Sequence, residues 1–204
     1  MTGVLDVDRT VAERVARANL LPDDAQRVFR AVLDALSRPG QVQRLATDPA
    51  SELPPVLLPV LALADLGTGV YVRHEDPHWV DVVRVVTNAP IADLGSARLV
   101  AAEGTLSATE LAALPRGSAS APEHGALVAL AVSDVDGGAT RWQLSGPGVP
   151  GELRVSLAGV GSDLLAARDV AVAGYPAGID LLLVAPDGRM VGLPRTTAVT
   201  ELED

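Results

Sequence analysis

The residues with the clearest chemical potential lie near the end of the chain, in the segment PRTT at 194–197. Here Arg195 stands beside the hydroxyl side chains of Thr196 and Thr197. A guanidinium group donates hydrogen bonds in a planar fork that matches phosphate oxygens, and hydroxyl groups add further donors. The same groups are equally suited to fixing the end of a strand. The segment therefore predicts either an anion-binding site or a structural clamp, and the sequence leaves both interpretations open.

Three more polar residues are candidates for this site. Asp180 stands at the start of the apolar run LLLV, where an unpaired carboxylate would be energetically costly. We expect it to pair with Arg195 if the last two strands form a hairpin, and a structural role is the favoured interpretation of that pair. Thr87 and Asn88, in the segment TNAP, are grouped with the anion site from their residue types alone.

Three other segments have a suggestive pattern and a simpler explanation. GPGVPG at 146–151 matches the glycine pattern of dinucleotide-binding loops, but its two prolines cannot donate backbone N–H groups to a phosphate, so we expect a plain turn. HEDPH at 74–78 gathers potential metal ligands, but Pro77 interrupts a shared helix face, so an exposed polar turn is favoured and no metal site is predicted. His124 stands in a predicted loop without a serine-elbow motif, so no catalytic residue is assigned.

The composition excludes several classes of site. The 204 residues carry 16 basic and 26 acidic side chains, a formal net charge of −10, so nucleic acid is not an expected partner. The absence of cysteine removes disulfides, thiolate metal ligands and cysteine nucleophiles. The 16 residues counted as basic are all arginine, so the chain has no lysine. A pyridoxal-phosphate aldimine cannot form and the lysine of a P-loop is missing, so no cofactor is predicted. Genomic base bias is the simplest reason for the missing lysine.

The apolar segments do not predict a membrane protein. The first twenty residues carry six charged side chains and no apolar core of a signal peptide. The longest apolar run, LPPVLLPVLALADL at 53–66, is shorter than a bilayer span and contains three prolines. We therefore expect a soluble, cytoplasmic protein with no membrane partner.

The first half of the chain predicts helices that alternate with strands. Capping boxes at Thr10–Glu13 and Ser107–Glu110 predict two short helices. A longer helix is expected from Pro22 until Pro39-Gly40, with one apolar face. Its apolar face comprises Val28, Phe29, Val32, Leu33 and Leu36. Further helices are expected after Pro59 and over 78–86, the latter ended by TNAP, and strands over 41–46, 68–73 and 97–102.

The second half predicts more strands. GALVALAVSDV at 125–135 and TRWQLS at 140–145 flank DGG, a hairpin signal, and 152–158 suggests a further strand. A helix over 162–174 is expected to be capped by Ser162, and the closing segment predicts a hairpin with PDG as its turn. The fold predicted is α/β, a single domain over residues 1–204 with a mixed central sheet flanked by helices. Residues 1–20 are expected to form a short N-terminal helix or arm.

A set of ordered segments resembles the PhnH family, a subunit of the bacterial carbon–phosphorus lyase system that uses phosphonates as a phosphorus source. The resemblance covers roughly residues 20–200, and its most specific pieces are the helix that ends in SRPG and the closing GID and PRTT segments. The matching segments, in order, are FRAVLDALSRPGQV, VVTNAPI, LPRGSASAPEHGALVAL, WQLSGPGV, YPAGIDLLLV and VGLPRTT.

The resemblance implies a fold and a set of partners. Its members have an α/β core similar to pyridoxal-phosphate transferases without the cofactor, form homodimers alone, and join PhnG, PhnI and PhnJ in a core complex. With PhnG, PhnI and the ATPase-like PhnL, they are required to move the ribose triphosphate of ATP onto an alkylphosphonate. PhnJ, a radical iron–sulfur enzyme, later breaks the carbon–phosphorus bond. The family has no agreed catalytic residue in PhnH itself.

Two functional hypotheses follow. In the first, the chain is mainly a structural and assembly subunit of a transferase complex of the ribose-1-phosphonate triphosphate synthase type, not catalytic alone, and PRTT is a clamp. In the second, Arg195, Thr196 and Thr197 bind a nucleotide or phosphonate directly. In both hypotheses ATP is a substrate of the complex and is not a cofactor of this chain. The sequence favours the first hypothesis, because it contains no evident nucleophile with a base, metal cluster or phosphate loop.

Overall fold

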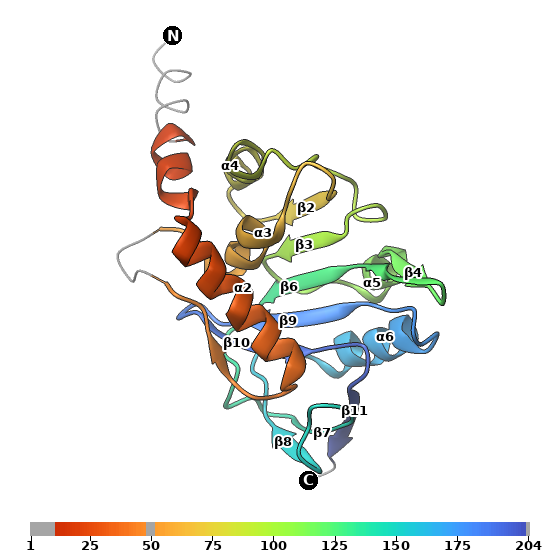
Figure 1. The fold of residues 1–204 in the computed structure, drawn as a ribbon. Helices are drawn as coiled ribbons and strands as arrows, with labels where there is room; N and C mark the ends of the chain where they lie inside the picture. Colours follow the sequence, from red (N-terminus) through yellow and green to blue (C-terminus); the bar gives the residue numbers. More distant parts are fainter. Residues whose placement is uncertain (1–10, 48–51, 203–204) are drawn as a thin grey trace.

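A central sheet of six strands organises the fold, in the order β1-β10-β9-β6-β3-β2 (Figure 1). The computed structural model describes residues 11–47 and 52–202. Strands β2, β3, β6 and β9 run parallel, whereas β10 and β1 continue the sheet antiparallel, so the sheet is mixed. The strands comprise β1 (Gln43–Arg44), β2 (Val70–Arg73), β3 (Leu99–Ala102), β6 (Leu127–Ala131), β9 (Asp180–Val184) and β10 (Arg189–Leu193).

The central strands are apolar on both faces, since helices cover one face of the sheet and helices with a small second sheet cover the other. In β3 all four residues are buried, and in β9 the four residues after Asp180 are buried. Parallel strands that are covered on both sides are typically continuous apolar runs rather than alternating ones. The run LLLV is therefore typical of a central strand of this kind.

One layer of helices packs against the first face of the sheet. It contains a helix over residues 11–18, α2 (Pro22–Ser37), the 3-10 turn η1 (Pro55–Leu57), α3 (Leu58–Leu63) and α4 (His78–Thr87). Figure 1 shows α2 crossing in front of β9 and β10. Val28, Val32 and Ala35 of α2 join the core against Leu182, Val184 and Met190.

The second face is covered by α5 (Ala108–Ala113), α6 (Ser162–Val172) and a small sheet in the order β11-β7-β8. The small sheet contains β7 (Arg141–Ser145), β8 (Leu153–Val155) and β11 (Ala198–Leu202). A two-stranded hairpin, β4 (Arg116–Ser118) with β5 (Ala121–Gly125), precedes β6. The predicted α/β class with a mixed sheet is therefore confirmed.

Several local predictions are confirmed. The long helix begins at Pro22 and ends at Ser37, just before Pro39-Gly40. The capping box of α5 is complete, because Ser107 accepts from the Glu110 backbone while the Glu110 side chain accepts from the Ser107 backbone. The closing strands β9 and β10 pair as a hairpin across PDG. The capping residue Thr10 lies outside the described residues, although residues 11–18 are helical.

The hairpin predicted around DGG is wrong. Strand β6 lies between β3 and β9 in the central sheet, whereas β7 lies between β11 and β8 in the small sheet. The segment 132–140 therefore links two sheets. The physical reason is burial: three consecutive residues of β6 are buried, which suits the middle of the covered sheet, whereas β7 alternates.

Three further sequence predictions need correction. Gly161, not Ser162, holds the N-cap position of α6, and no side chain among the described residues caps that helix. His124 lies in strand β5 rather than in a loop, and neither β5 nor β11 was predicted. On α2, the apolar face is narrower than predicted, since Phe29 is 48% and Leu33 is 55% exposed.

Within residues 11–47 and 52–202, none of the helices combines the length and the apolar character that a membrane span requires.

Candidate functional site

The closing hairpin brings Arg195 to Asp180. Leu193 of β10 pairs with Leu181 of β9, so Asp180 at the start of β9 lies next to the chain that leaves β10. The guanidinium Nη2 of Arg195 donates to Oδ2 of Asp180 at 2.6 Å, and Nε is 3.2 Å from both carboxylate oxygens. The backbone N–H of Arg195 also donates to Oδ1 at 2.7 Å. The expected Asp180–Arg195 pair is therefore present, in a fork-to-fork geometry.

The guanidinium of Arg195 is almost fully used within the protein. Its Nη1 donates to the carbonyl oxygens of Pro122 at 2.8 Å and Pro176 at 3.2 Å. An arginine side chain has five N–H donors. Four of them are engaged by residues that the structure describes, which leaves one N–H on Nη2 without a described partner. This one side chain connects β5, the loop after α6, β9 and the segment after β10.

Gly125 allows the guanidinium to lie where it does. A Cβ at this position would lie 2.8 Å from Nη2 of Arg195 and in collision with the carbonyl oxygen of Gly178. A glycine is therefore needed for close approach rather than for an unusual backbone angle. The segment EHGALVAL thus packs directly against PRTT.

A second arginine, Arg168 of α6, holds the same turn and was missed by sequence reasoning. Its side chain is completely buried, and Nη2 donates to the carbonyl oxygens of Pro194 at 2.6 Å and Thr197 at 3.0 Å. Burial lowers the pKa of Arg168, while the charges of Asp169 and Asp180 oppose that shift. A signal was present in the sequence, because Arg168 shares a helix face with apolar Leu164 at spacing i, i+4.

The two threonines contribute mainly through their backbone. The N–H of Thr197 donates to the carbonyl of Pro194 at 2.9 Å, which closes a tight turn. The Thr197 side chain is buried, and its hydroxyl has no hydrogen-bond partner among the described residues. Thr196 is partly buried, and its carbonyl lies against Gly146 of the turn between β7 and β8.

GPGVPG forms that turn and is followed by strand β8, as the sequence predicted. Gly148 has a φ of +81°, and a Cβ there would collide with the carbonyl of Ser37 at the end of α2. The turn therefore packs between PRTT and SRPG, so three of the family-like segments meet in space.

Thr87 and Asn88 do not lie beside Arg195. Thr87 Oγ1 donates to the carbonyl of Val83 at 2.7 Å and accepts from the N–H of Ala89 at 3.1 Å. Asn88 ends α4 in a left-handed conformation with a φ of 54°. Both residues precede the bridge between Ile91 and β2, and β3 and β6 separate β2 from β9. The segment TNAP thus ends a helix, and the structure does not group it with PRTT.

A hollow of about 580 Å³ lies beside PRTT. Its lining combines polar and apolar side chains, namely Pro147, Asp169, Val172, Tyr175, Arg195, Thr196, Thr197, Ala198 and Val199. The charges here are balanced, because Arg195 is paired with Asp180 and Arg168 lies 3.3 Å from Asp169. This balance favours the clamp over an anion site.

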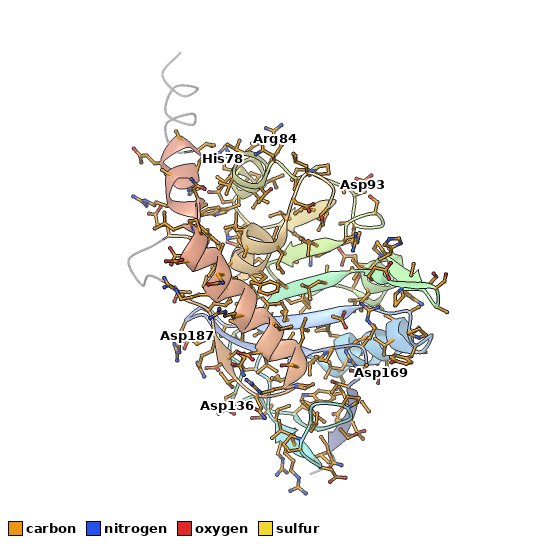
Figure 2. The ribbon with its side chains drawn as sticks, viewed as in Figure 1. His78, Arg84, Asp93, Asp136, Asp169 and Asp187 are labelled. Atoms are coloured by element: carbon orange, nitrogen blue, oxygen red, sulfur yellow. The ribbon has the colours of Figure 1, made fainter. Side chains whose placement is uncertain are left out.

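The HEDPH segment is more buried than the expected exposed turn. The carboxylate of Asp76 is paired with Arg14, which lowers the pKa of Asp76. His74 packs near Trp79 and lies 3.5 Å from a carboxylate oxygen of Glu103. In the part of the chain that the structure describes, no three His, Asp or Glu side chains lie close enough to hold a metal ion. Figure 2 shows His78 at the opposite end of the molecule from Asp169.

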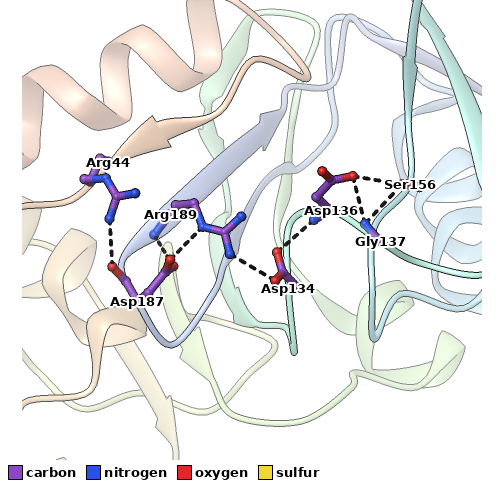
Figure 3. Close-up of polar contacts among 7 residues, drawn as sticks. All are labelled: Arg44, Asp134, Asp136, Gly137, Ser156, Asp187 and Arg189. Carbon is purple, nitrogen blue, oxygen red and sulfur yellow. Dashed lines mark hydrogen bonds and ion pairs between the residues drawn. The ribbon is translucent and has the colours of Figure 1, made fainter.

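A polar network lies beyond the carboxyl ends of strands β6 and β9, at the opposite end of these strands from PRTT (Figure 3). Arg189 joins two carboxylates, with Nη2 at 2.9 Å from Asp134 and Nε at 2.6 Å from Asp187, and it lowers the pKa of both. Asp136 accepts from Ser156 at 3.0 Å. Ligands of open α/β sheets commonly bind at the carboxyl ends of the strands. Here these side chains bind one another and tie DVDGG to the PDG turn.

Comparison with known proteins is consistent with these segments. Residues 19–200 match the family described as "Bacterial phosphonate metabolism protein (PhnH)". The "Putative C-P lyase subunit protein HtxG" of Stutzerimonas stutzeri is 33% identical over 179 residues, which is 85% of each chain. The matched range contains every segment that carried the resemblance, so the resemblance is confirmed.

Proposed function

Because this chain belongs to the PhnH family of bacterial phosphonate metabolism proteins, we propose that it is an assembly subunit of a carbon–phosphorus lyase complex. Support comes from the relative named as a subunit of that lyase. The chain would work with PhnG, PhnI and PhnJ, and functionally with PhnL, in the transfer of the ribose triphosphate of ATP to an alkylphosphonate. We further propose a cytoplasmic location, a homodimer when partners are absent, and a core built like that of pyridoxal-phosphate transferases without the cofactor.

The observation that carries the assembly role is the engagement of Arg195. Four of its five N–H donors are already bound to Asp180, Pro122 and Pro176. An arginine that binds substrate phosphates must present its fork to the ligand. Arg195 instead connects four segments of its own chain, which supports its role as a clamp. In this proposal the transfer reaction is carried out by partner subunits.

A second candidate is direct binding of a nucleotide or phosphonate at PRTT. One observation favours it: Arg195 keeps one N–H that no residue in 11–47 or 52–202 binds, and it lines the hollow of about 580 Å³ with Thr196 and Thr197. A ligand there would use that N–H and the hydroxyl group of Thr196, since the hydroxyl group of Thr197 is buried. The balanced charges of the neighbouring arginines and aspartates count against a polyanion.

Co-purification tests the assembly role. The tagged chain is co-expressed with the other carbon–phosphorus lyase subunits, and composition and mass are read by size exclusion with light scattering. We expect a stable complex of several subunits. A homodimer that elutes without any of those subunits would refute the proposal.

Two variants separate the clamp from the anion site. For a clamp, Arg195→Ala lowers the melting temperature, and the assembled complex keeps its activity per mole. For an anion site, it abolishes ATP or alkylphosphonate binding in calorimetry while folding and assembly persist. Thr196→Val is the matched variant that leaves the Arg195–Asp180 pair intact. A loss of binding in Thr196→Val would establish the anion site, and unchanged binding in both folded variants would exclude it.

A further inference from the structure

We infer that the outer face of α2, defined by Arg27, Phe29, Arg30 and Leu33, docks an apolar surface with an acidic rim on another subunit. The inference rests on the proposed assembly function and adds to it the surface and the chemistry of the partner. Helix α2 crosses the front of the molecule in Figure 1, and the four side chains are exposed to solvent.

The apolar part of the face is Phe29 and Leu33. They are 48% and 55% exposed, whereas Val28 and Val32, one residue earlier in each case, are buried against the sheet. Residues four apart lie next to one another on a helix, so the two side chains form one apolar ridge. Phe29 is the only phenylalanine of the chain. Half of a large aromatic side chain left in water is typical of a surface that another protein covers.

The basic part of the face is unusual for this chain. The protein has a formal net charge of −10, yet Arg27 and Arg30 of α2 and Arg44 of β1 line a single hollow of about 850 Å³. Arg27 is paired with Asp24, whereas Arg30 and Arg44 form no ion pair within residues 11–47 and 52–202, so these two arginines carry the unpaired positive charge. The acidic residues of that hollow, Asp34 and Asp187, are paired with Arg38 and Arg189. The local excess is positive, so the complementary surface is acidic.

A second copy of this chain fits the face less well. In a two-fold arrangement the same patch meets itself. The four residues that define the patch include no carboxylate, and Asp34 on the same helix is already paired with Arg38, so Arg30 would gain no acidic partner from the same patch of a second copy. A basic patch packed against itself without carboxylates is electrostatically unfavourable. The charge pattern therefore favours a different polypeptide with carboxylates around an apolar centre.

Two matched pairs of variants test the docking face in the full-length chain. Leu33→Glu is compared with Val85→Glu on α4, because Val85 is also a helical apolar residue and is 51% exposed. Arg30→Glu is compared with Arg154→Glu on β8, another exposed arginine. Each tagged variant is co-expressed with the other carbon–phosphorus lyase subunits. Affinity for the complex, the mass of the isolated chain and the melting temperature are then measured.

We expect Leu33→Glu and Arg30→Glu to weaken assembly at least about tenfold, with melting temperatures close to wild type, and the two controls to assemble normally. The Arg30→Glu effect should shrink as salt rises, since rim charges are screened. Assembly that is unchanged in both α2 variants overturns the inference and leaves the assembly function intact. A homodimer that dissociates in Leu33→Glu, with assembly preserved, assigns the face to a second copy and also overturns it. If wild type joins no subunit, the proposed function and this inference both fail.

Discussion

Replacing Arg195 by Met is the most direct perturbation of PRTT, because Met keeps an aliphatic side chain but removes every donor. Removing one partner of a buried ion pair typically costs about 3–5 kcal/mol, since the other charge is left uncompensated. Arg195 and Asp180 retain 13% and 20% exposure, so solvent screens part of that loss. The carbonyls of Pro122 and Pro176 also lose their donor, at about 1 kcal/mol each. We therefore expect a destabilisation of about 3–4 kcal/mol.

The assay is denaturant unfolding together with thermal melting. For a chain of this length each kcal/mol lowers the melting temperature by roughly 2–4 °C, so Arg195→Met should melt roughly 10 °C below wild type. Arg154→Met on β8 is the control and should change the free energy of unfolding by less than about 0.5 kcal/mol. In a double-mutant cycle with Asp180→Asn, the two changes should be non-additive by about 1–3 kcal/mol. Equal stability of Arg195→Met and Arg154→Met would refute the clamp.

Three further perturbations follow from the contacts. Gly125→Ala should destabilise by about 2 kcal/mol or more in a urea titration, because its Cβ collides with Gly178 and crowds Arg195; a neutral effect would contradict this packing. Arg189 lowers the pKa of Asp134 and Asp187. The ion pairs therefore stabilise the folded protein above about pH 4, and this stabilisation is lost as the pH falls through the lowered pKa values. Arg189→Met should therefore show a shallower loss of stability on acidification, and identical acid profiles would rule out this linkage. Ser107→Ala removes the cap of α5 and should cost about 1 kcal/mol by chemical denaturation, whereas no change would mean that the capping box is dispensable.

Local features were predictable from the sequence because local chemistry decides them. Pro22 and Pro39-Gly40 bracket α2, Ser107 and Glu110 cap α5, and the PDG turn sets the hairpin of β9 and β10. That hairpin in turn places Asp180 beside the arginine of PRTT. The central contact of the candidate site therefore depends on residues only fifteen apart.

Contacts between distant segments were decided only by the tertiary structure. A turn signal such as DGG specifies a reversal of the chain, but the partner of β6 depends on which strands share its apolar faces. The buried Arg168 reaches PRTT only because α6 packs against the chain that leaves β10. TNAP ends α4 three strands away from β9, so residue type alone could not group it with PRTT.

The apolar spacing on α2 illustrates the same division. Periodicity in the sequence determined that α2 is a helix with one apolar side. How much of that side is buried depends on the width of the surface beneath it. The sheet covers Val28, Val32 and Ala35 and leaves Phe29 and Leu33 in solvent, because a helix contacts a sheet along a narrow stripe. Burial is a property of two packed surfaces, and the sequence of one element specifies only its own side.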